Sequence, residues 1–294
     1  MNTIEIEAFL AILRHGNLTE AAKSLFVSQS TLSNRLFELE REVGMKLIER
    51  GRGGKSLVLT ENGKQFLLIA KRWETLIQDT KRLQSQTNNL SLSIGTVDTF
   101  HAFVFPPLYQ ALCDHVPAIN LNFRTYNSTE LYIQVDRGEI DVAFTLLNVP
   151  MQNIIVEKVY TEERVVLRKE VSPHHGEAFI APDDLDPANE IFFIGDTAFH
   201  TWHQAWKGIK EYPSVQVDTT QLLLLMLNKI GSWSIVPMCI ARKLVSLGSY
   251  ACYQLEDKPP ERVCYKIHSK YLSTSAAEGI GILDSYLPAV LQKE

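Results

Sequence analysis

Hydrophobic residues recur at helical spacing at the start of the chain, with polar residues between them. The pattern predicts a first helix that Thr3 caps and that Gly16 ends. The inner side of this helix is formed by Ile6, Phe9, Ile12 and Leu13. A one-sided apolar face of this kind is typical of a helix that packs against a globular core.

Two short helices joined by a tight turn are predicted between Leu18 and Leu39. Ala21 and Ala22 remove side-chain bulk where these helices cross, and Ser28 suits the N-cap of the second helix. The buried face of the second helix consists of Leu32, Leu36, Leu39 and Val43, and its polar face of Gln29, Ser30, Thr31, Ser33 and Asn34. Short, uncharged polar side chains suit hydrogen bonding to base edges in a DNA major groove, although any helical hairpin buries leucines and exposes polar residues.

A basic, glycine-rich tip lies between two short apolar runs in the stretch from Lys46 to Thr60. This pattern predicts a β-hairpin, or wing, whose cations are placed to meet DNA phosphates; a solvated loop is the alternative. We therefore predict DNA contacts by Ser28, Gln29, Ser30, Thr31, Ser33, Asn34, Arg35, Arg50, Arg52 and Lys55.

A long amphipathic helix is predicted from Thr60, as its N-cap, to about Thr87. Its apolar residues are three or four positions apart, as in a coiled-coil seam, and its other faces are polar. This favours pairing with a second copy of the chain, although a single packed helix shows the same pattern. The residues predicted to mediate dimerisation are Phe66, Ile69, Trp73, Leu76 and Leu83. The Ser-, Gln- and Asn-rich stretch 84–93 is predicted to be a linker.

From Leu90 onward, strand patterns alternate with helix patterns. In a first lobe we expect strands at 90–97, 119–126 and 140–146 and helices at 104–115 and 128–137. In a second lobe we expect strands at 164–167, 191–194, 215–217 and 234–236 and helices at 199–210, 221–230 and 238–247. A strand at 262–268 returns the chain to the first lobe, and a final helix covers 275–291. The alternation predicts mostly parallel sheets in two α/β lobes that clamp a small molecule.

The composition narrows the class of protein. The 294 residues are 45% hydrophobic, and no apolar run approaches the roughly 20 residues of a membrane span, so no membrane partner is expected. The start of the chain lacks the basic residues of a secretion signal, which predicts a cytoplasmic location. The net charge is −5, but residues 1–87 carry +3 and the remainder −8. The acidic part is therefore a separate body from the predicted DNA-binding part.

The cysteines give no sign of a metal site. Cys113, Cys239, Cys252 and Cys264 form no Cys-x-x-Cys pair, so we predict buried free thiols; a redox switch through the last three is the alternative. The chain also lacks the Gly-x-Ser-x-Gly, phosphate-loop and Gly-x-Gly-x-x-Gly motifs. No catalytic residue, cofactor or metal is predicted, and an enzyme or solute-binding protein with an accessory helical domain is the less favoured class.

The N-terminal part of the chain resembles the LysR-type transcriptional regulators. Over residues 4–66 the family motif is matched by Phe9, Ala21, Ala22, Leu25, Val27, Ser28, Gln29, Ser33, Leu39, Glu40, Gly44, Leu47, Arg50, Leu59, Thr60 and Gly63. A weaker similarity continues through 138–143 and 235–237. Ser30, Asn34 and Ile48 depart from the family, which often has Pro, Arg or Lys, and Phe at these positions. The first two departures bear on base preference rather than on the fold.

The resemblance implies a fold and a set of partners. The fold is α/β overall, with a winged helix-turn-helix at 1–60, a linker helix at 61–89 and a two-lobed, periplasmic-binding-protein-like effector domain at 90–294. The first lobe covers about 90–161 and 268–294, and the second about 162–267. A homodimer or homotetramer would bend double-stranded promoter DNA, change the bend when an effector binds, and act on RNA polymerase.

In a two-lobed clamp the ligand lies between strand ends and helix N-termini. We therefore predict effector contacts by Asp98, Thr99, Phe100, His101, Asn127, Ser128, Thr129, Thr145, Thr197, Phe199, His200 and Thr201. Asp98 and Ser128 equally suit simple helix caps. A carboxylate in the cleft would repel an anion, which predicts a neutral, zwitterionic or cationic effector unless Asp98 points away.

Overall fold

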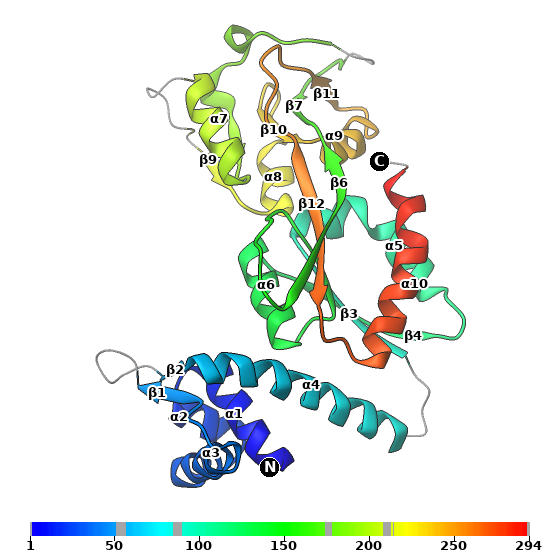
Figure 1. The fold of residues 1–294 in the computed structure, drawn as a ribbon. Coiled ribbons are helices and arrows are strands. Elements are labelled where there is room, and N and C mark those ends of the chain that lie inside the picture. The colour runs from blue at the N-terminus through cyan, green and yellow to red at the C-terminus, as the bar shows by residue number, and fades with distance from the viewer. Residues whose placement is uncertain are drawn as a thin grey trace. The chain divides into compact units, whose positions relative to one another are not determined.

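A computed structural model describes residues 2–50, 57–84, 90–173, 178–207, 213 and 215–292 of the chain. It divides into two compact units, one of Met1–Asn88 with Lys270–Ala277 and one of Asn89–Ser269 with Glu278–Glu294. In Figure 1 the helices of Met1–Asn88 run from blue to cyan. Within the described ranges, no helix combines the length and the apolar character that crossing a membrane requires.

Three helices pack around one apolar core in the first unit. Asn2, rather than Thr3, caps the first helix: its side chain accepts a hydrogen bond from the backbone N–H of Glu5, whose carboxylate accepts one from the backbone N–H of Asn2. Gly16 ends this helix with a φ of 69°, as predicted. The helices are α1 (Thr3–His15), α2 (Leu18–Ser24) and α3 (Gln29–Val43). The buried core includes Ile6, Phe9, Ile12, Ala21, Ala22, Leu32 and Leu39.

The predicted wing is a two-stranded antiparallel hairpin. Its strands are β1 (Ile48–Arg50) and β2 (Leu57–Leu59), and Ile48 lies opposite Leu59 in the register. The tip of the hairpin, with Arg52 and Lys55, lies outside the described residues, as does the side chain of Arg50.

The long helix α4 (Glu61–Gln84) follows the hairpin. Phe66 is 5% exposed, and its ring meets the ring of Phe9 edge-on with 5.3 Å between the centroids. Trp73 also packs against this core, whereas Ile69 and Leu76 are 51% and 61% exposed. Two residues of the predicted dimer seam, Phe66 and Trp73, therefore pack against the core of their own chain. The exposed seam positions are Ile69 and Leu76, and the side chain of Leu83 lies outside the described part.

The first lobe of the second unit is built on a five-stranded sheet in the order β4-β3-β5-β12-β6. Its strands are β3 (Leu90–Thr96), β4 (Ile119–Thr125), β5 (Val142–Thr145), β6 (Ile154–Glu162) and β12 (Arg262–Ser269). β3 pairs in parallel with β4 and β5, but β12 is antiparallel to β5 and β6. The whole of β12 belongs to this sheet, so residues 262–267 lie in the first lobe and not in the second.

Helices cover both faces of this sheet. Figure 1 shows α6 (Ser128–Arg137) on one face and α5 (Pro106–Cys113) and α10 (Thr274–Leu291) on the other. The helix predicted from Val104 starts later: a π-helical turn, η1 (Phe100–Val104), precedes it, and α5 begins at Pro106. Proline suits a first helical position because its missing N–H would have no partner there.

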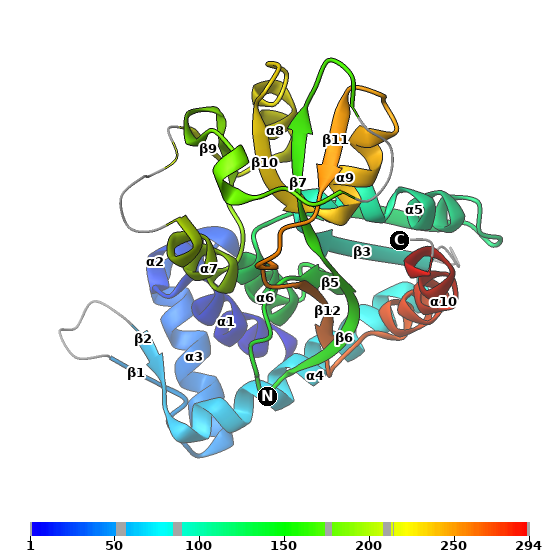
Figure 2. The same cartoon turned by 90° about the horizontal axis from the view of Figure 1, so that it is seen from above.

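The second lobe corrects the prediction of mostly parallel sheets. Its main sheet has the order β10-β7-β11 with both pairings antiparallel, and the small β8-β9 pair is parallel. Figure 2 shows β7 between β10 and β11. The strands are β7 (Arg164–Lys169), β8 (Ile191–Phe193), β9 (Val215–Val217), β10 (Trp233–Pro237) and β11 (Tyr250–Tyr253). The helices are α7 (Thr197–Lys207), α8 (Thr220–Met226) and α9 (Met238–Val245), with 3-10 turns η2 (Pro182–Asp184) and η3 (Pro187–Asn189).

Candidate functional site

The N-terminal turn of α3 presents an exposed polar surface. Ser28 caps the helix, as predicted, because its hydroxyl accepts a hydrogen bond from the backbone N–H of Thr31 at 3.1 Å. The same hydroxyl hydrogen-bonds those of Ser30 and Thr31. Of the predicted α3 contacts, Ser28, Gln29, Ser30, Thr31 and Asn34 are exposed, while Ser33 and Arg35 are partly exposed. The opposite face is closed into the core by Leu32 and Leu39, so the polar face is the one free to meet a ligand.

Glu40 attaches the C-terminal half of α3 to the wing. Its side chain is 7% exposed, and Oε1 accepts hydrogen bonds from the backbone N–H groups of Leu47 at 2.8 Å and Ile48 at 3.1 Å. Oε2 accepts one from Nζ of Lys46 at 2.7 Å. This carboxylate therefore satisfies two buried donors at the start of the hairpin. The sequence motif includes Glu40, but no sequence pattern indicated this role.

Gly63 lets α4 start close to the wing. A Cβ atom at this position would lie 2.0 Å from the carbonyl oxygen of Leu47, which no side chain tolerates. The hydroxyl of Thr60 donates to the carbonyl of Lys46 at 2.7 Å and accepts from the N–H of Gly63 at 2.9 Å, as expected of an N-cap. The motif residues Thr60 and Gly63 thus fix the position of α4 on the hairpin.

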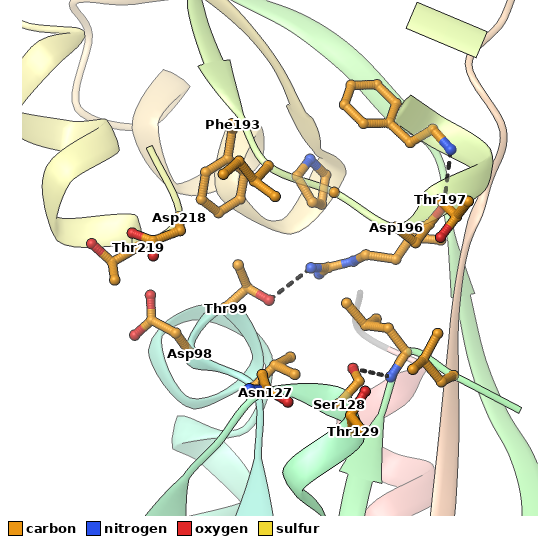
Figure 3. Close-up of a pocket in the computed structure, with 18 of the residues that line it drawn as sticks. Asp98, Thr99, Asn127, Ser128, Thr129, Phe193, Asp196, Thr197, Asp218 and Thr219 are labelled. Atoms are coloured by element: carbon orange, nitrogen blue, oxygen red, sulfur yellow. Dashed lines mark hydrogen bonds between the residues drawn. The ribbon is translucent and has the colours of Figure 1, made fainter. Parts of the chain in front are cut away.

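A cavity of about 750 Å³ lies between the lobes of the second unit. Figure 3 shows side chains from both lobes pointing into it. Seven of the predicted effector residues line this cavity: Asp98, Thr99, Asn127, Ser128, Thr129, Thr197 and Phe199. The volume suits a small organic molecule.

Three predicted residues of the first lobe point into the protein instead. Phe100 and Thr145 are fully buried, and the Thr145 hydroxyl donates to the backbone carbonyl of Ser128 at 3.4 Å. Nε2 of His101 donates to the carbonyl of Arg124 at 3.0 Å, and Nδ1 accepts from the hydroxyl of Tyr109 at 2.5 Å. Burial lowers the pKa of His101, although the hydrogen bond to the Arg124 carbonyl acts in the opposite direction. The lowered pKa favours a neutral ring. None of the three lines the cavity.

Two predicted residues of the second lobe also lie outside the lining. Both His200 and Thr201 are exposed on α7. The His200 ring packs edge-on against Phe192, with 5.3 Å between the centroids. The Thr201 hydroxyl donates to the carbonyl of Thr197 one turn earlier, at 3.0 Å. α7 therefore offers Thr197 and Phe199 to the cavity and turns the next residues away.

Sequence reasoning missed a buried ion pair in the cavity wall. Arg164 at the start of β7 is 3% exposed, and its Nη2 lies 2.5 Å from Oδ2 of Asp196. Oδ1 of Asp196 accepts a hydrogen bond from the N–H of Phe199 at 2.9 Å. Burial by itself would raise the pKa of Asp196, but this hydrogen bond and the charge of Arg164 outweigh it, and the pKa falls below its ordinary value.

Arg262, which also lines the cavity, forms a second buried pair. Its side chain is 3% exposed, and its Nε donates to Oε1 of Glu162 at 2.7 Å. Nη1 donates to the hydroxyl of Thr99 at 2.7 Å, and the guanidinium stacks on the ring of Phe100. Oε2 of Glu162 accepts from the backbone N–H of Cys239 at 3.0 Å. This pair therefore connects β6 and β12 of the first lobe with α9 of the second.

Neither Asp98 nor Ser128 caps the helix that follows it in the sequence. Asn127, not Ser128, is the N-cap of α6, and the Ser128 hydroxyl accepts a hydrogen bond from the N–H of Leu146 at 3.1 Å. Asp98 accepts two hydrogen bonds from Thr220 of the second lobe. Asp98 therefore does not point away from the cleft, and its carboxylate remains in the cavity wall.

The four cysteines are free thiols. Cys239 and Cys264 are buried as predicted and Cys252 is partly exposed, but Cys113 is exposed, which corrects the prediction for that residue. Burial raises the pKa of Cys252 to about 11 and that of Cys264 further, which favours the unreactive thiol form. The described residues include no cluster of three or more His, Cys, Asp or Glu side chains suited to a metal ion.

Comparison with known proteins gives the family of the chain. Residues 4–64 match the bacterial regulatory helix-turn-helix protein, LysR family, and residues 85–279 match the LysR substrate binding domain. The chain belongs to the LysR family of transcriptional regulators. Its two structural units thus correspond to a DNA-binding part and an effector-binding part, which confirms the predicted fold class.

Three known proteins illustrate the similarity of this LysR-type regulator to its relatives. An uncharacterized HTH-type transcriptional regulator, YwqM of Bacillus subtilis, is 31% identical over 149 residues, which cover half of each chain. A probable RuBisCO transcriptional regulator of Phaeodactylum tricornutum is 27% identical over 85% of this chain and 78% of the relative. The solved full-length structure of LysG from Corynebacterium glutamicum, with bound effector Arg, aligns over 99% of both chains with a TM-score of 0.67 and 19% identity. At that identity the likeness shows the fold alone.

Proposed function

We propose that this LysR-type regulator reads promoter DNA with the N-terminal face of α3 and responds to a small molecule in the cavity between its lobes. The observation that carries the DNA-binding half is the exposure of Gln29, Ser30, Thr31 and Asn34 on a helix whose other face is buried. A helix of this kind fits the major groove, where Gln and Asn pair with adenine in a bidentate manner.

The remaining DNA contacts follow from the wing. Arg50, Arg52 and Lys55 are proposed to bind phosphates on either side of the groove that α3 enters. Residues 1–87 carry a charge of only +3, so binding depends on a few placed cations and on the geometry of a dimer rather than on a broad positive surface. Ser28, Ser33 and Arg35 complete the proposed interface from the first two turns of α3.

Self-association is proposed to run along α4. Ile69 and Leu76 are large apolar side chains that the described chain leaves exposed on this helix, seven positions apart. That spacing places them on one side of a coiled-coil seam. A homodimer of this kind would present two α3 helices to one duplex. We further propose a cytoplasmic protein, since its promoter and RNA polymerase are found there, and assign it no enzymatic activity.

The effector site is proposed to be the cavity, with Asp98, Thr99, Asn127, Ser128, Thr129, Thr197 and Phe199 as contacts. Arg164, Asp196, Asp218, Thr219 and Arg262 also line it. Because both lobes supply contacts, a ligand binds differently to open and closed arrangements of the lobes. That difference in affinity is what an effector needs in order to shift a conformational equilibrium.

A gel-shift assay on DNA flanking the gene for this chain tests the proposal. We expect the full-length protein to retard one fragment at moderate salt and a stabilising metabolite to alter the complex. An enzyme or solute-binding protein would instead leave every fragment unretarded and turn over or bind a metabolite without any effect on DNA. Retardation that no cavity ligand alters would support the DNA-binding half alone.

A further inference from the structure

The charges that line the cavity do not balance. Of the residues that the structure describes, six charged ones line it: Asp98, Glu130, Asp196, Asp218, Arg164 and Arg262. Four are acidic and two are basic. A ligand in the cavity experiences the charge that ion pairs within the protein leave unneutralised, and this charge depends on the partner of each group.

Both cations are already matched by carboxylates. Arg164 pairs with Asp196 and also donates to the carbonyl oxygen of Pro260. Arg262 pairs with Glu162, a buried carboxylate that is not among the residues lining the cavity. A second anion beside either guanidinium would have to compete with a buried, hydrogen-bonded carboxylate. Neither arginine therefore offers an unpaired charge to an anionic ligand.

Among the described residues, three carboxylates of the cavity remain without a cation. Glu130 accepts a hydrogen bond from the backbone N–H of Asn127, and Asp98 accepts two from Thr220, all from uncharged donors. Within the described chain, Asp218 makes no hydrogen bond or ion pair. The unpaired charge of the cavity is therefore negative, and it comes from both lobes.

Two of these carboxylates converge. Asp98 belongs to the first lobe and Asp218 to the second, and Asp218 lies two positions before Thr220, the residue that Asp98 binds. Figure 3 shows their carboxylates facing each other across the gap between the lobes. An ammonium group has three donors and no acceptor, and a guanidinium has five donors, so either can bridge two carboxylates.

We propose that the effector of this regulator carries a positively charged nitrogen group, an ammonium or a guanidinium, which Asp98 and Asp218 hold between the two lobes. The proposal rests on the effector site proposed above and names the chemical class that this site takes. The cation draws the two lobes together at the point where Asp98 already binds Thr220. The apolar remainder of such a ligand would lie against Phe193 and Phe199, which line the same cavity.

Matched probes of one length test the charge class directly. Thermal unfolding and calorimetric titration of the full-length protein are compared for 1,4-diaminobutane, agmatine, succinate and 1,4-butanediol. We expect one or both amines to raise the unfolding midpoint, and succinate and the diol to leave it unchanged. Stabilisation by succinate but by neither amine, or no stabilisation by either amine, overturns the proposal.

Paired variants place the binding in the cavity. Asp218→Asn removes one proposed charge contact and is expected to weaken binding of the stabilising amine about tenfold. Asp183→Asn makes the same change of net charge at an exposed site outside the cavity and is expected to have no effect. Equal losses in both variants overturn the assignment to Asp218.

The same preparations separate this proposal from the one it rests on. If succinate binds and alters the gel shift, the cavity is the effector site but the charge class is wrong. If an amine binds to the parent protein and more weakly to Asp218→Asn, but no probe alters the gel shift, the proposed charge class is supported. The proposal that the cavity ligand controls DNA binding is then wrong.

Discussion

Asp98 and Thr220 join the two lobes of the effector unit across a separation of 122 positions in the chain. Oδ2 of Asp98 accepts a hydrogen bond from the backbone N–H of Thr220 at 2.7 Å and one from its hydroxyl at 2.5 Å. Thr220 is buried and begins α8, so the Asp98 carboxylate bonds an N–H at a helix start that the helix itself cannot pair. The Asp98 carboxylate therefore connects the lobes at this point through both the backbone and the side chain of Thr220.

Thr220→Val is expected to weaken this connection. The change keeps the shape of the side chain and the backbone donor, but it removes the hydroxyl that binds the Asp98 carboxylate. A hydrogen bond to a charged group contributes about 1.5–3 kcal/mol, and part of that is lost from the unfolding free energy. Urea unfolding followed by tryptophan fluorescence measures the change. Thr201→Val, which removes an exposed hydroxyl bonded within α7, is the control, and equal stability of the two variants would contradict the expectation.

Gln29→Ala is expected to weaken binding to the operator far more than binding to unrelated DNA. A bidentate contact to one base is worth about 1–3 kcal/mol of discrimination, whereas phosphate contacts are the same on all sequences. Gel-shift titrations on an operator fragment and on its scrambled counterpart at one salt concentration measure both. The exposed Lys23→Ala on α2 serves as the control for a general loss of affinity. An equal loss on both fragments for Gln29→Ala would contradict the placement of α3 in the groove.

Glu40→Ala is expected to destabilise the DNA-binding unit by about 1–3 kcal/mol for each backbone donor that it leaves buried without a partner. Leu47 and Ile48 both lose their acceptor in this variant. Glu40→Gln keeps one oxygen acceptor and should be less damaging. Chemical unfolding of the two variants, compared with the exposed control Glu20→Ala, measures the order. A Glu40→Ala protein as stable as the control would show that water replaces the carboxylate.

The Asp196–Arg164 pair predicts how the second lobe responds to acid. The pKa of Asp196 is lowered in the folded protein, so its contribution is present above its unfolded pKa of about 3.9 and is lost as the pH falls through the folded pKa. Asp196→Asn should therefore cost most at neutral pH, and its difference from the parent protein should shrink below pH 4. Unfolding midpoints from pH 7 to pH 3 measure this, with Asp183→Asn as the control. A difference that does not change with pH would mean that the charge of Asp196 is not what stabilises the lobe.

The DNA-binding unit was predictable because its signals are local. Ser28 and Gly16 act within four residues of their own positions, as does the Thr60 hydroxyl when it accepts from the N–H of Gly63, and the core of α1 to α3 follows from helical spacing. The misassignments in this unit are of two kinds. The first is the choice of helix cap, because Asn2 and Thr3 both suit that position. The second concerns α4, because the spacing of its apolar residues is the same whether they pack on the core of their own chain, as Phe66 does, or on a second copy.

The effector cavity was only half predictable because its residues meet through long-range pairing. Arg164 and Arg262 stand at the first positions of apolar strands, where sequence alone indicates only a strand. β6 was missed, and its antiparallel pairing with β12 joins segments about 100 positions apart, which periodicity cannot show. Thr99 and Leu146, the neighbours of Phe100 and Thr145, line the cavity, but helix and strand geometry turns the Phe100 and Thr145 side chains into the core.

Hydroxyl-radical footprinting of the full-length protein on DNA flanking its own gene tests the central claim most directly. If paired α3 helices read successive turns of one duplex, two protected half-sites should appear, with their centres separated by a whole number of helical turns of about 10 base pairs. In the Gln29→Ala variant, we expect the specific protection at the half-sites to be lost, whereas the phosphate contacts that flank them should remain. A single unpaired patch, or no protection on any fragment at low ionic strength, would contradict the account.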